Sequence, residues 1–415
     1  MPQYLSPGVY VEEVPGTPPI VGVGTSTAGF IGVVDTTVQN PDGYVPDGGA
    51  EGDTAFVMPF KPGLPADPAN PQASDHFDLA PANEPRLVTS WPQFKNQFGD
   101  VQAGNNVLAH AVYAFFNNGG TRCHVIRVDD LTSTTDVQDA LEKFEAIDEI
   151  AIVAAPGALD AAVQLAVIEH CENLKDRFAV IDGQQTTTID VANIQGTVRD
   201  SNYAALYFPR IQVFDPVTAK DAATRGLILI PPSGAIAGIY ARVDQERGVH
   251  KAPANEIVRG ALGLAYLVSK NEQDGLNPDG INVIRSFEGN LKVWGARTLG
   301  GDDNGEFKYV NVRRFMNFLR ESLDEGTQFV VFEPNSPPLW QRINRAVTAF
   351  LTNVWRDGAL FGTTPEQAFY VKCDETTNPP EVRELGQVIT EIGVAIVRPA
   401  EFVIFRISQV TLPAA

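Results

Sequence analysis

Hydrophobic and polar residues follow two alternating patterns over residues 87–280. Short, mostly apolar runs such as CHVIRV at 123–128 are separated by amphipathic stretches such as 107–116. The first pattern predicts strands and the second predicts helices. Because parallel strands need long crossover connections, we predict an α/β domain with a mostly parallel sheet covered by helices. The predicted strands are 123–128, 150–155, 178–181, 204–208 and 227–230, and the predicted helices are 107–116, 159–175 and 191–200.

The pattern changes after Gly280. Two short predicted strands, at 281–286 and 293–299, are followed by two amphipathic helices. The second helix follows the sequence NSPP, and proline suits the first turn of a helix. The chain then ends with two β-prone segments, VAIVRPAEF and VIFRISQ. We therefore predict an α+β domain over residues 281–415.

The N-terminal part has a third pattern. Valines alternate with polar residues between Pro7 and Pro15, which predicts an extended arm over residues 1–20. Residues 21–86 begin with a Gly-rich apolar segment, predicted as a buried strand with a turn, and continue into a stretch rich in proline, glycine and acidic residues at 40–85. That stretch has too few apolar residues to offset the entropy of ordering, so we predict an exposed insertion.

The chain has 415 residues, and its acidic charge is unevenly distributed. The formal net charge is −20, of which residues 281–415, with 14 basic and 16 acidic side chains, carry −2. Residues 1–280 carry the remaining −18. This acidic field counts against binding to nucleic-acid phosphate. It suits a solvent-facing surface, whereas a near-neutral C-terminal part suits a crowded interior.

The sequence also indicates where the protein is made. No apolar run approaches the roughly 20 residues that cross a bilayer, and the N-terminus has neither the basic start nor the apolar core of a leader. We expect synthesis in the cytoplasm. Cys123, Cys171 and Cys373 are too few and too far apart for a disulfide scaffold, so we expect reduced, mostly buried thiols.

No motif supplies a catalytic or metal-binding constellation. The glycines within 22–29 miss the dinucleotide spacing G-x-G-x-x-G, because Thr27 holds the third glycine position, and no G-x-x-x-x-G-K-[ST] sequence is present. Ser26 lies in a near match to a nucleophile elbow, without a placed base or acid. The loop at Asp302 lacks the EF-hand spacing, and the five histidines show no clustering. We expect no enzyme activity, no cofactor and no metal.

The features that remain concern assembly. β-prone arms stand at the two ends, each too isolated to bury both faces within its own domain, and exposed strands of this kind are templates for pairing with other chains. An alternative stays open, in which each arm closes the edge of a sheet in its own subunit. The candidate strand-exchange residues are Val9, Tyr10, Val11, Glu12 and Glu13 at the N-terminus, and Phe402, Val403, Ile404, Phe405, Arg406 and Ile407 at the C-terminus.

Four stretches of this sequence resemble the tail sheath proteins of contractile phage tails and contractile injection systems. The first three are SPGVYVEEV from Ser6, LVTSWPQFKNQFG from Leu87 and PPSGAIAGIYARVDQERGVHKAPANE from Pro231. The fourth is the run from Tyr309 to Ile407, which contains YVNVRRF, FVVFEPNSPPLW, AFYVKCDETTN and IVRPAEFVIFRI. Together these stretches span both ends and the middle of the chain.

The resemblance implies a structural polymer. Sheath subunits form six-fold rings stacked into a helical sleeve around an inner tube, and the metastable extended sleeve shortens to drive the tube through a target envelope. It implies an outer α/β domain, an inner C-terminal α+β domain and terminal arms that exchange strands with neighbouring subunits. Flexible flanks, PGTPP after the first arm and RPAE before the second, are expected to absorb the rotation during contraction.

The resemblance also implies partners and a location. The partners are further copies of this chain, an inner tube protein, and baseplate and terminator or cap proteins, with no nucleic acid and no membrane insertion. The sheath would assemble in the producing bacterial cytoplasm and belong to a phage virion tail or a contractile injection particle. Another class of function is the alternative: a soluble α/β enzyme or ligand-binding protein built on residues 87–260.

The second C-terminal helix offers a candidate contact with the tube. Arg342, Arg345 and Arg356 align on its polar face, and residues 334–355 contain no acidic residue. These arginines are placed to pair with an acidic tube surface. Two alternatives stay open: an ordinary solvated face, and salt bridges to another sheath subunit.

Overall fold

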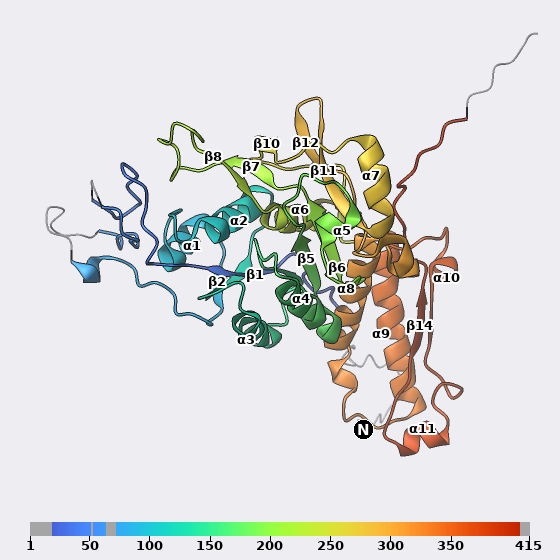
Figure 1. Ribbon diagram of the computed structural model, residues 1–415. Helices are drawn as coiled ribbons and strands as arrows, with labels where there is room; N and C mark the ends of the chain where they lie inside the picture. Colours follow the sequence, from blue (N-terminus) through green and yellow to red (C-terminus); the bar gives the residue numbers. More distant parts are fainter. Residues whose placement is uncertain (1–18, 51–52, 64–71, 407–415) are drawn as a thin grey trace, which may run out of the picture. The chain divides into compact units, whose positions relative to one another are not determined.

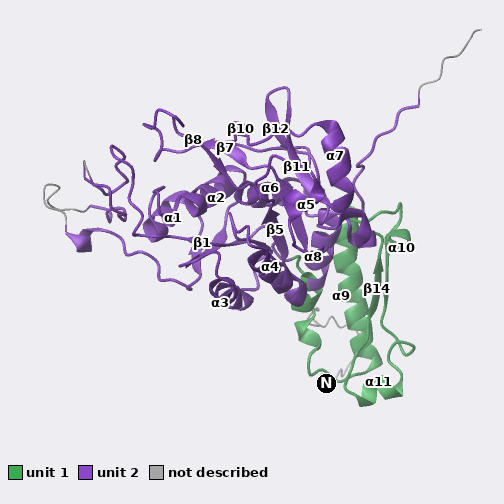
Figure 2. Cartoon of the chain, in the orientation of Figure 1, with its two compact units in different colours: residues 1–22, 321–396 green, residues 23–320, 397–415 purple. Residues whose placement is uncertain are grey.

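The computed structural model describes residues 19–50, 53–63 and 72–406 (Figure 1). The contacts within the chain divide it into two compact units (Figure 2). Unit 1 comprises residues 1–22 and 321–396, and unit 2 comprises residues 23–320 and 397–415. The chain therefore passes between the units three times.

Unit 2 is built on a large sheet. In the described residues this sheet has nine strands in the order β2-β3-β1-β4-β5-β6-β11-β12-β9. Pairing is parallel from β3 to β11, and β2, β12 and β9 add antiparallel pairs at the edges, which confirms the predicted mostly parallel sheet. The strands are β1 (Ala28–Val33), β2 (Arg86–Val88), β3 (Cys123–Val128), β4 (Ile152–Ala154), β5 (Phe178–Asp182), β6 (Ala204–Phe208), β9 (Glu256–Ile257), β11 (Ile281–Phe287) and β12 (Asn290–Val293).

Helices cover both faces of the sheet because its central strands are apolar on both sides. Phe30 and Ile31, neighbours on β1, belong to different apolar clusters. The cluster around Phe30 includes α2 and α6, and the cluster around Ile31 includes α3 and α4. The helices of unit 2 are α1 (Trp91–Phe98), α2 (Asn106–Asn117), α3 (Thr134–Glu145), α4 (Ala161–Leu174), α5 (Val191–Gln195), α6 (Ser233–Arg247) and α7 (Lys270–Leu276), with 3-10 turns η1 (Ala73–Asp75), η2 (Asn277–Asp279) and η3 (Gly301–Phe307).

Two glycines let α6 approach α2 closely. A Cβ atom at Gly234 would lie 2.3 Å from the backbone oxygen of Ala111, and one at Gly238 would lie 2.4 Å from that of Phe115. Both distances are far shorter than a carbon atom tolerates next to an oxygen. The spacing of four residues places both glycines on one face of α6, so that face can pack directly on the backbone of α2.

Three predicted elements differ from the structure. Strand β8 (Leu227–Ile230) lies outside the large sheet and pairs antiparallel with β7 (Ile211–Phe214), which also pairs with β10 (Gly263–Leu264). The connection from β7 to β8 contains no helix, so the chain returns as a hairpin. The helix predicted over 191–200 ends at Gln195, because Gly196 adopts a positive φ of 66°. The strand predicted over 293–299 is instead β12, which ends at Val293.

The segment 40–85, predicted as an exposed insertion, is fastened to unit 2 by buried polar side chains. The amide of Asn40 donates to Gln102 Oε1 at 3.3 Å and accepts the N–H of Ala103 at 2.9 Å. The side chain of Gln102 in turn bonds both the N–H and the carbonyl of Val57, at 2.9 and 2.8 Å. Asn40 and Gln102 are both buried. Hydrogen bonds thus order the described part of a segment that is poor in apolar residues.

Unit 1 combines the end of one long helix, a second long helix and a small sheet. Helix α9 begins with two prolines after Ser336, in agreement with the predicted second C-terminal helix, and it buries Leu339, Ile343 and Val347 along one stripe. Ile20, also buried, packs against Gly326 at the end of α8. The elements are α8 (Val310–Gly326, which begins in unit 2), η4 (Gln328–Val330), α9 (Pro337–Arg356), α10 (Pro365–Ala368), β13 (Phe369–Lys372), α11 (Pro380–Glu384) and β14 (Glu391–Val394).

The division between the units differs from the predicted boundary at residue 280. Strand β11 pairs in parallel with β6 near the middle of the large sheet, and its residues Ile281 and Val283 are fully buried in the cluster that contains Ile31. Moving β11 to another domain would expose this apolar surface. The division falls instead within α8, between residues 320 and 321, and residues 397–406 belong to unit 2.

A buried histidine and arginine form an internal polar contact in unit 2. The Arg177 guanidinium is fully buried and bonds Asp176, the Phe144 carbonyl and, at 3.3 Å, His170 Nε2. The imidazole must accept this hydrogen bond, so it is neutral. Burial, and then the nearby Arg177 charge, lower the pKa of His170 from 6.5 to about 4.

This lowered pKa predicts a loss of stability in mild acid. Between pH 6.5 and 4 the unfolded chain protonates His170 while the folded chain does not, so His170 lowers the free energy of unfolding as the pH falls, by about 3 kcal/mol in total. We predict that His170→Gln removes this component. Unfolding by urea at several pH values measures the difference between wild type and variant. If the free energies of unfolding of wild type and His170→Gln differ by the same amount at pH 7 and pH 4, the lowered pKa of His170 is contradicted.

Candidate assembly site

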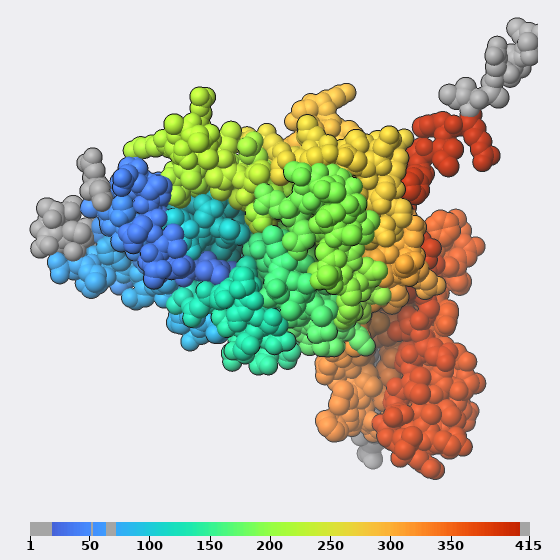
Figure 3. All heavy atoms as spheres, viewed as in Figure 1, coloured from blue at the N-terminus to red at the C-terminus, as the bar shows by residue number. Residues whose placement is uncertain are grey.

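The C-terminal arm is an apolar segment that leaves the surface of unit 2. Phe402, Val403, Ile404 and Phe405 are between 70% and 84% exposed. Within the described chain, residues 402–406 form no strand and pair with no other strand. In the space-filling view this segment stands clear of unit 2 (Figure 3). Exposing four consecutive large apolar side chains is unfavourable, which is typical of a segment that binds a partner.

The other predicted arm residues lie outside the described part of the chain. These are Val9, Tyr10, Val11, Glu12 and Glu13 at the N-terminus and Ile407 at the C-terminus. Arg406, the last described residue, is exposed. The structure therefore locates the first five residues of the predicted C-terminal arm.

Unit 1 contains a sheet with open edges. In the described residues, β13 and β14 pair only with each other, antiparallel, from Phe369 opposite Val394 to Lys372 opposite Glu391. One isolated bridge, between Leu360 and Ile396, continues beyond β14. The outer edge of β14 pairs with no strand in the described residues, and an unpaired row of backbone N–H and C=O groups accepts an added strand. At β13, by contrast, the Val371 carbonyl accepts a hydrogen bond from Asn344 Nδ2 at 3.3 Å.

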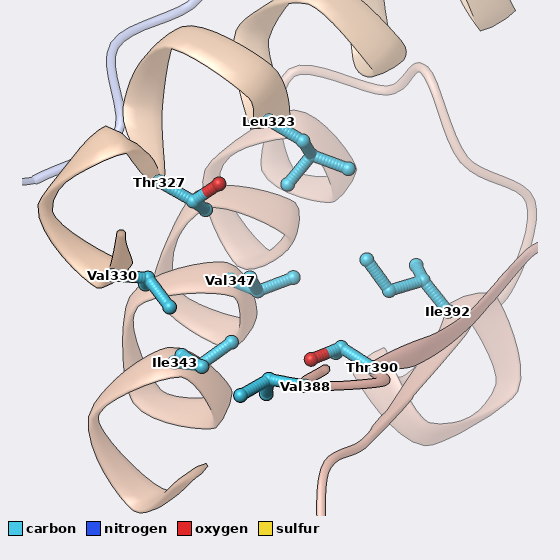
Figure 4. A pocket seen from close by; sticks show the side chains of 8 residues that line it. All are labelled: Leu323, Thr327, Val330, Ile343, Val347, Val388, Thr390 and Ile392. Atoms are coloured by element: carbon cyan, nitrogen blue, oxygen red, sulfur yellow. The ribbon is translucent and has the colours of Figure 1, made fainter. Parts of the chain in front are cut away.

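A pocket of about 280 Å³, lined by six aliphatic side chains and two threonines, lies beside β14 (Figure 4). Val388, Thr390 and Ile392 alternate along the chain and point into it from one side, as period-two alternation requires. The opposite wall comes from helices α8 and α9 and the turn η4, whereas β13 contributes no side chain. The pocket residues on this wall are Leu323, Val330, Ile343 and Val347, together with Thr327 between α8 and η4.

The geometry relates the pocket to the open edge. A strand added alongside β14 would place every second side chain on the face that carries Thr390 and Ile392. A cavity of roughly 150 Å³ with apolar walls is enough to hold a benzene ring. The pocket therefore has room for an aromatic side chain and part of an aliphatic one. Sequence reasoning missed the pocket, because VITEI at 388–392 shows no regular alternation of apolar and polar residues.

The predicted tube-contact arginines have different surroundings. Arg342 is already paired: its guanidinium lies 3.3 Å from Glu333, just outside the acid-free stretch, and over the ring of Phe329. Arg345 and Arg356 are exposed and form no ion pair within the described residues. Two of the three arginines thus remain available for an external acidic partner.

Two histidines, the cysteines and the acidic loop that were considered as catalytic or metal-binding groups are buried or bonded to neighbouring side chains. His110 bonds Asp215 at 3.1 Å, His124 bonds Glu149 at 2.6 Å, and all three cysteines are free and buried. Asp302, in the loop considered for calcium, forms salt bridges with Arg297 and Lys308 at 3.1 and 3.0 Å. In the described ranges no group of three or more His, Cys, Asp or Glu side chains is arranged to hold a metal ion. None of the described helices has the length and apolar character of a membrane span.

Comparison with protein families identifies the class of protein. The phage tail sheath protein central domain matches residues 132–299, and the phage tail sheath C-terminal domain matches residues 302–410. These matches cover about two thirds of the chain. The chain belongs to the phage tail sheath protein family.

Curated relatives agree with this assignment. The tail sheath protein of Burkholderia phage BcepMu is 28% identical over 239 residues, which are 54% of this chain and 48% of that protein. A putative prophage major tail sheath protein of Pseudomonas aeruginosa (strain UCBPP-PA14) is 26% identical over 276 residues, 65% of this chain and 67% of that protein. The tail sheath protein of Vibrio phage KVP40 is 28% identical over 180 residues, 42% of this chain and 25% of that protein. The matches thus span between a quarter and two thirds of these relatives.

Solved structures are similar over nearly the whole chain. The sheath complex of an extracellular contractile injection system, PVC, in the contracted state has a TM-score of 0.72 and 28% identity, covering 99% of both chains. The helical sheath of the anti-feeding prophage in the contracted state has the same TM-score and identity, covering 97% of this chain and 99% of that chain. A chain of the anti-feeding prophage baseplate has a TM-score of 0.72 and 27% identity, covering 98% of this chain and all of that chain.

Filling the pocket tests its presence in the isolated chain. We predict that Val347→Phe, whose ring would enter the pocket, leaves the fold intact and slows local opening of residues 388–394. The additional apolar surface that the ring buries should stabilise the closed state by about 1 kcal/mol. Hydrogen exchange measured by mass spectrometry follows this opening. Ala349→Phe, on the exposed side of the same helix, is the matched control and should change nothing. Exchange that becomes tenfold faster in Val347→Phe would mean that the pocket does not exist.

Proposed function

We propose that this chain is a structural sheath subunit that polymerises into a contractile helical sleeve around an inner tube. The observation that supports this proposal most is the exposed arm Phe402–Phe405. The same chain also has an open sheet edge at β14 with an adjacent pocket lined mainly by aliphatic side chains. The likeness to chains of contracted sheaths supports the proposal. Energy stored in the extended sleeve and released on contraction would drive the tube through a target envelope.

The polymer is held together by strand exchange between subunits. The C-terminal arm of one subunit adds to the free edge of β14 in a neighbour and directs alternate side chains into its pocket. Each backbone hydrogen bond contributes about 1 kcal/mol net, and each buried Phe or Ile side chain about 1.5–3 kcal/mol. A short strand of this kind therefore makes a strong link that occupies few residues.

The N-terminal arm, Val9 to Glu13, is proposed to join the same assembly as a second donated strand. This arm lies outside the described residues, and the support comes from the segment that follows it. Ile20 is buried against Gly326, so the segment after the arm is anchored in unit 1. A donated segment needs such an anchor, because force applied to it must reach a folded body.

The subunit would work with further partners of the sheath. We propose that Arg345 and Arg356 face an acidic inner tube, and that the baseplate and a terminator or cap protein close the two ends of the sleeve. The similar chain from an anti-feeding prophage baseplate supports the baseplate contact. Assembly would take place in the cytoplasm of the producing bacterium, within a phage tail or an injection particle. Membership of a structural family favours this role over catalysis.

Removing the arm tests the proposed function. We predict that the full chain forms tubes or long helical particles in negative-stain microscopy, whereas a chain ending at Glu401 gives folded subunits that do not polymerise. The matched control is Ile404→Val with Phe402→Leu, which keeps an apolar strand and should still assemble. A full chain that forms only small uniform particles, with or without its tube, would contradict the proposal and favour a soluble protein.

The tube contact has its own test. We predict that Arg345→Glu combined with Arg356→Glu reduces recovery of the tube protein with the sheath at least tenfold, since like charges would face each other, while the fold is retained. Co-sedimentation measures this recovery. Arg225→Glu, at an exposed arginine of unit 2, is the control. Unchanged tube recovery in the double variant would reject these arginines as the contact.

A further inference from the structure

The segment just before the arm is fixed to unit 2 by a group of side chains around Glu401. One carboxylate oxygen of Glu401 accepts hydrogen bonds from Arg297 Nε at 2.9 Å and Asn277 Nδ2 at 2.7 Å. The other accepts from Arg297 Nη2 at 2.9 Å and the Tyr309 hydroxyl at 2.8 Å. Four donors from three residues thus hold one carboxylate, and the Arg297 contact is bidentate, the strongest geometry for such a pair.

The environment strengthens this contact. Arg297 is almost completely buried, and its remaining amino group bonds the Asn277 carbonyl at 3.0 Å and Asp302 at 3.1 Å. Burial by itself would raise the pKa of Glu401, but the hydrogen bonds from Arg297, Asn277 and Tyr309 outweigh it and lower that pKa below its ordinary value. Glu401 is therefore ionised at neutral pH, and removing it would leave a buried guanidinium short of its main partner.

The fixed segment ends abruptly. Upstream, the carbonyl of Val397 accepts a hydrogen bond from Asn311 at 3.4 Å, so residues 397–401 are tied to unit 2 at both ends. Immediately downstream, Phe402 and the next three residues are exposed. The expectation that RPAE is a flexible flank therefore does not fit its last residue, since Glu401 is the most firmly held part of this segment.

We propose that Glu401 is a positioning residue that clamps the root of the C-terminal arm to unit 2, so that the exchangeable strand starts at Phe402. This inference rests on the proposed strand exchange. Because the clamp lies between β14 and the arm in the chain, tension on the arm is transferred to unit 2 through Arg297. The β14 edge and pocket of unit 1, which receive a neighbour's arm, are then not pulled apart by tension on the subunit's own arm.

The clamp also favours assembly. Without it, residues 398–401 would lose their attachment to unit 2 and would have to be ordered again whenever the arm binds. Ordering the backbone of one residue costs about a factor of ten in the association constant. We therefore expect loss of the clamp to raise the concentration needed for sheath assembly at least tenfold.

The first experiment measures the clamp in unassembled subunits. A nitroxide attached at Ala400→Cys reports on the root, and one at Ile404→Cys reports on the arm; the native cysteines are buried, which favours selective labelling. We expect slow motion at 400 and fast motion at 404 in the wild-type background, and fast motion at both sites in Glu401→Ala. Glu246→Ala, at an exposed carboxylate on α6, should leave the root slow. Equal mobility at 400 and 404 in the wild-type background would overturn the clamp.

The second experiment measures the concentration at which sheaths appear by light scattering and microscopy. Glu401→Ala is expected to need at least tenfold more protein, and Glu246→Ala the same amount as wild type. If Glu401→Ala does not fold, Glu401→Gln, which keeps the side-chain length but loses the charge, replaces it in both experiments. An unchanged threshold with a mobile root would overturn the positioning role. Failure of the wild-type chain to assemble would instead refute the proposed function, and the labels would still decide whether the clamp exists.

Discussion

The unpaired edge of β14 sets the requirement that the proposed assembly must meet. Backbone N–H and C=O groups need partners, and the two-stranded sheet of unit 1 leaves a row of them open along the outer edge of β14 within the described chain. The same chain carries an apolar segment, Phe402–Phe405, that is exposed and pairs with no strand among the residues described. The edge lacks hydrogen-bond partners, and the segment exposes apolar side chains. A polymer in which each subunit donates its segment to the edge of a neighbour would remove both unfavourable features.

Unit 2 is suited to transmit force because its core is large and closed. Its sheet is covered on both faces, and α6 and α2 touch through their backbones at Gly234 and Gly238. Buried ionic groups add fixed points, among them Arg314, which bonds Asp244 at 2.6 Å and the Thr25 carbonyl at 2.8 Å. Since close-packed interiors transmit strain with little deformation, tension that reaches the proposed clamp at Glu401 would act on unit 2 as a whole.

The sequence predicted the features that depend on periodicity. The parallel strands from β3 to β11 were readable because each is a short apolar run, and α9 was readable from its apolar stripe and its two starting prolines. The family resemblance came from motifs at both ends and in the middle of the chain. These signals lie in short stretches of sequence, so they can be read without knowing which distant residues are in contact.

The features that were missed depend on contacts between distant residues. Strand β11 follows a change of pattern at Gly280, yet it completes the large sheet because Ile281 and Val283 fit a cluster made elsewhere. The composition of residues 40–85 predicts an exposed segment, but Asn40 anchors it to unit 2 through a hydrogen bond with Gln102. In the same way, nothing adjacent to Glu401 in the sequence indicates that Arg297 will bind it.

The proposed assembly requires the arm of one subunit to pair with β14 of another. The most direct measurement is disulfide formation in sheaths assembled from two chains, one carrying only Ile404→Cys and the other only Thr390→Cys. We expect a disulfide-linked dimer of the two different chains, formed in assembled particles and absent from dilute subunits. A third chain that carries both cysteines serves as the comparison. Pairing between subunits would be contradicted if sheaths assemble without the mixed dimer while this third chain forms a disulfide within itself.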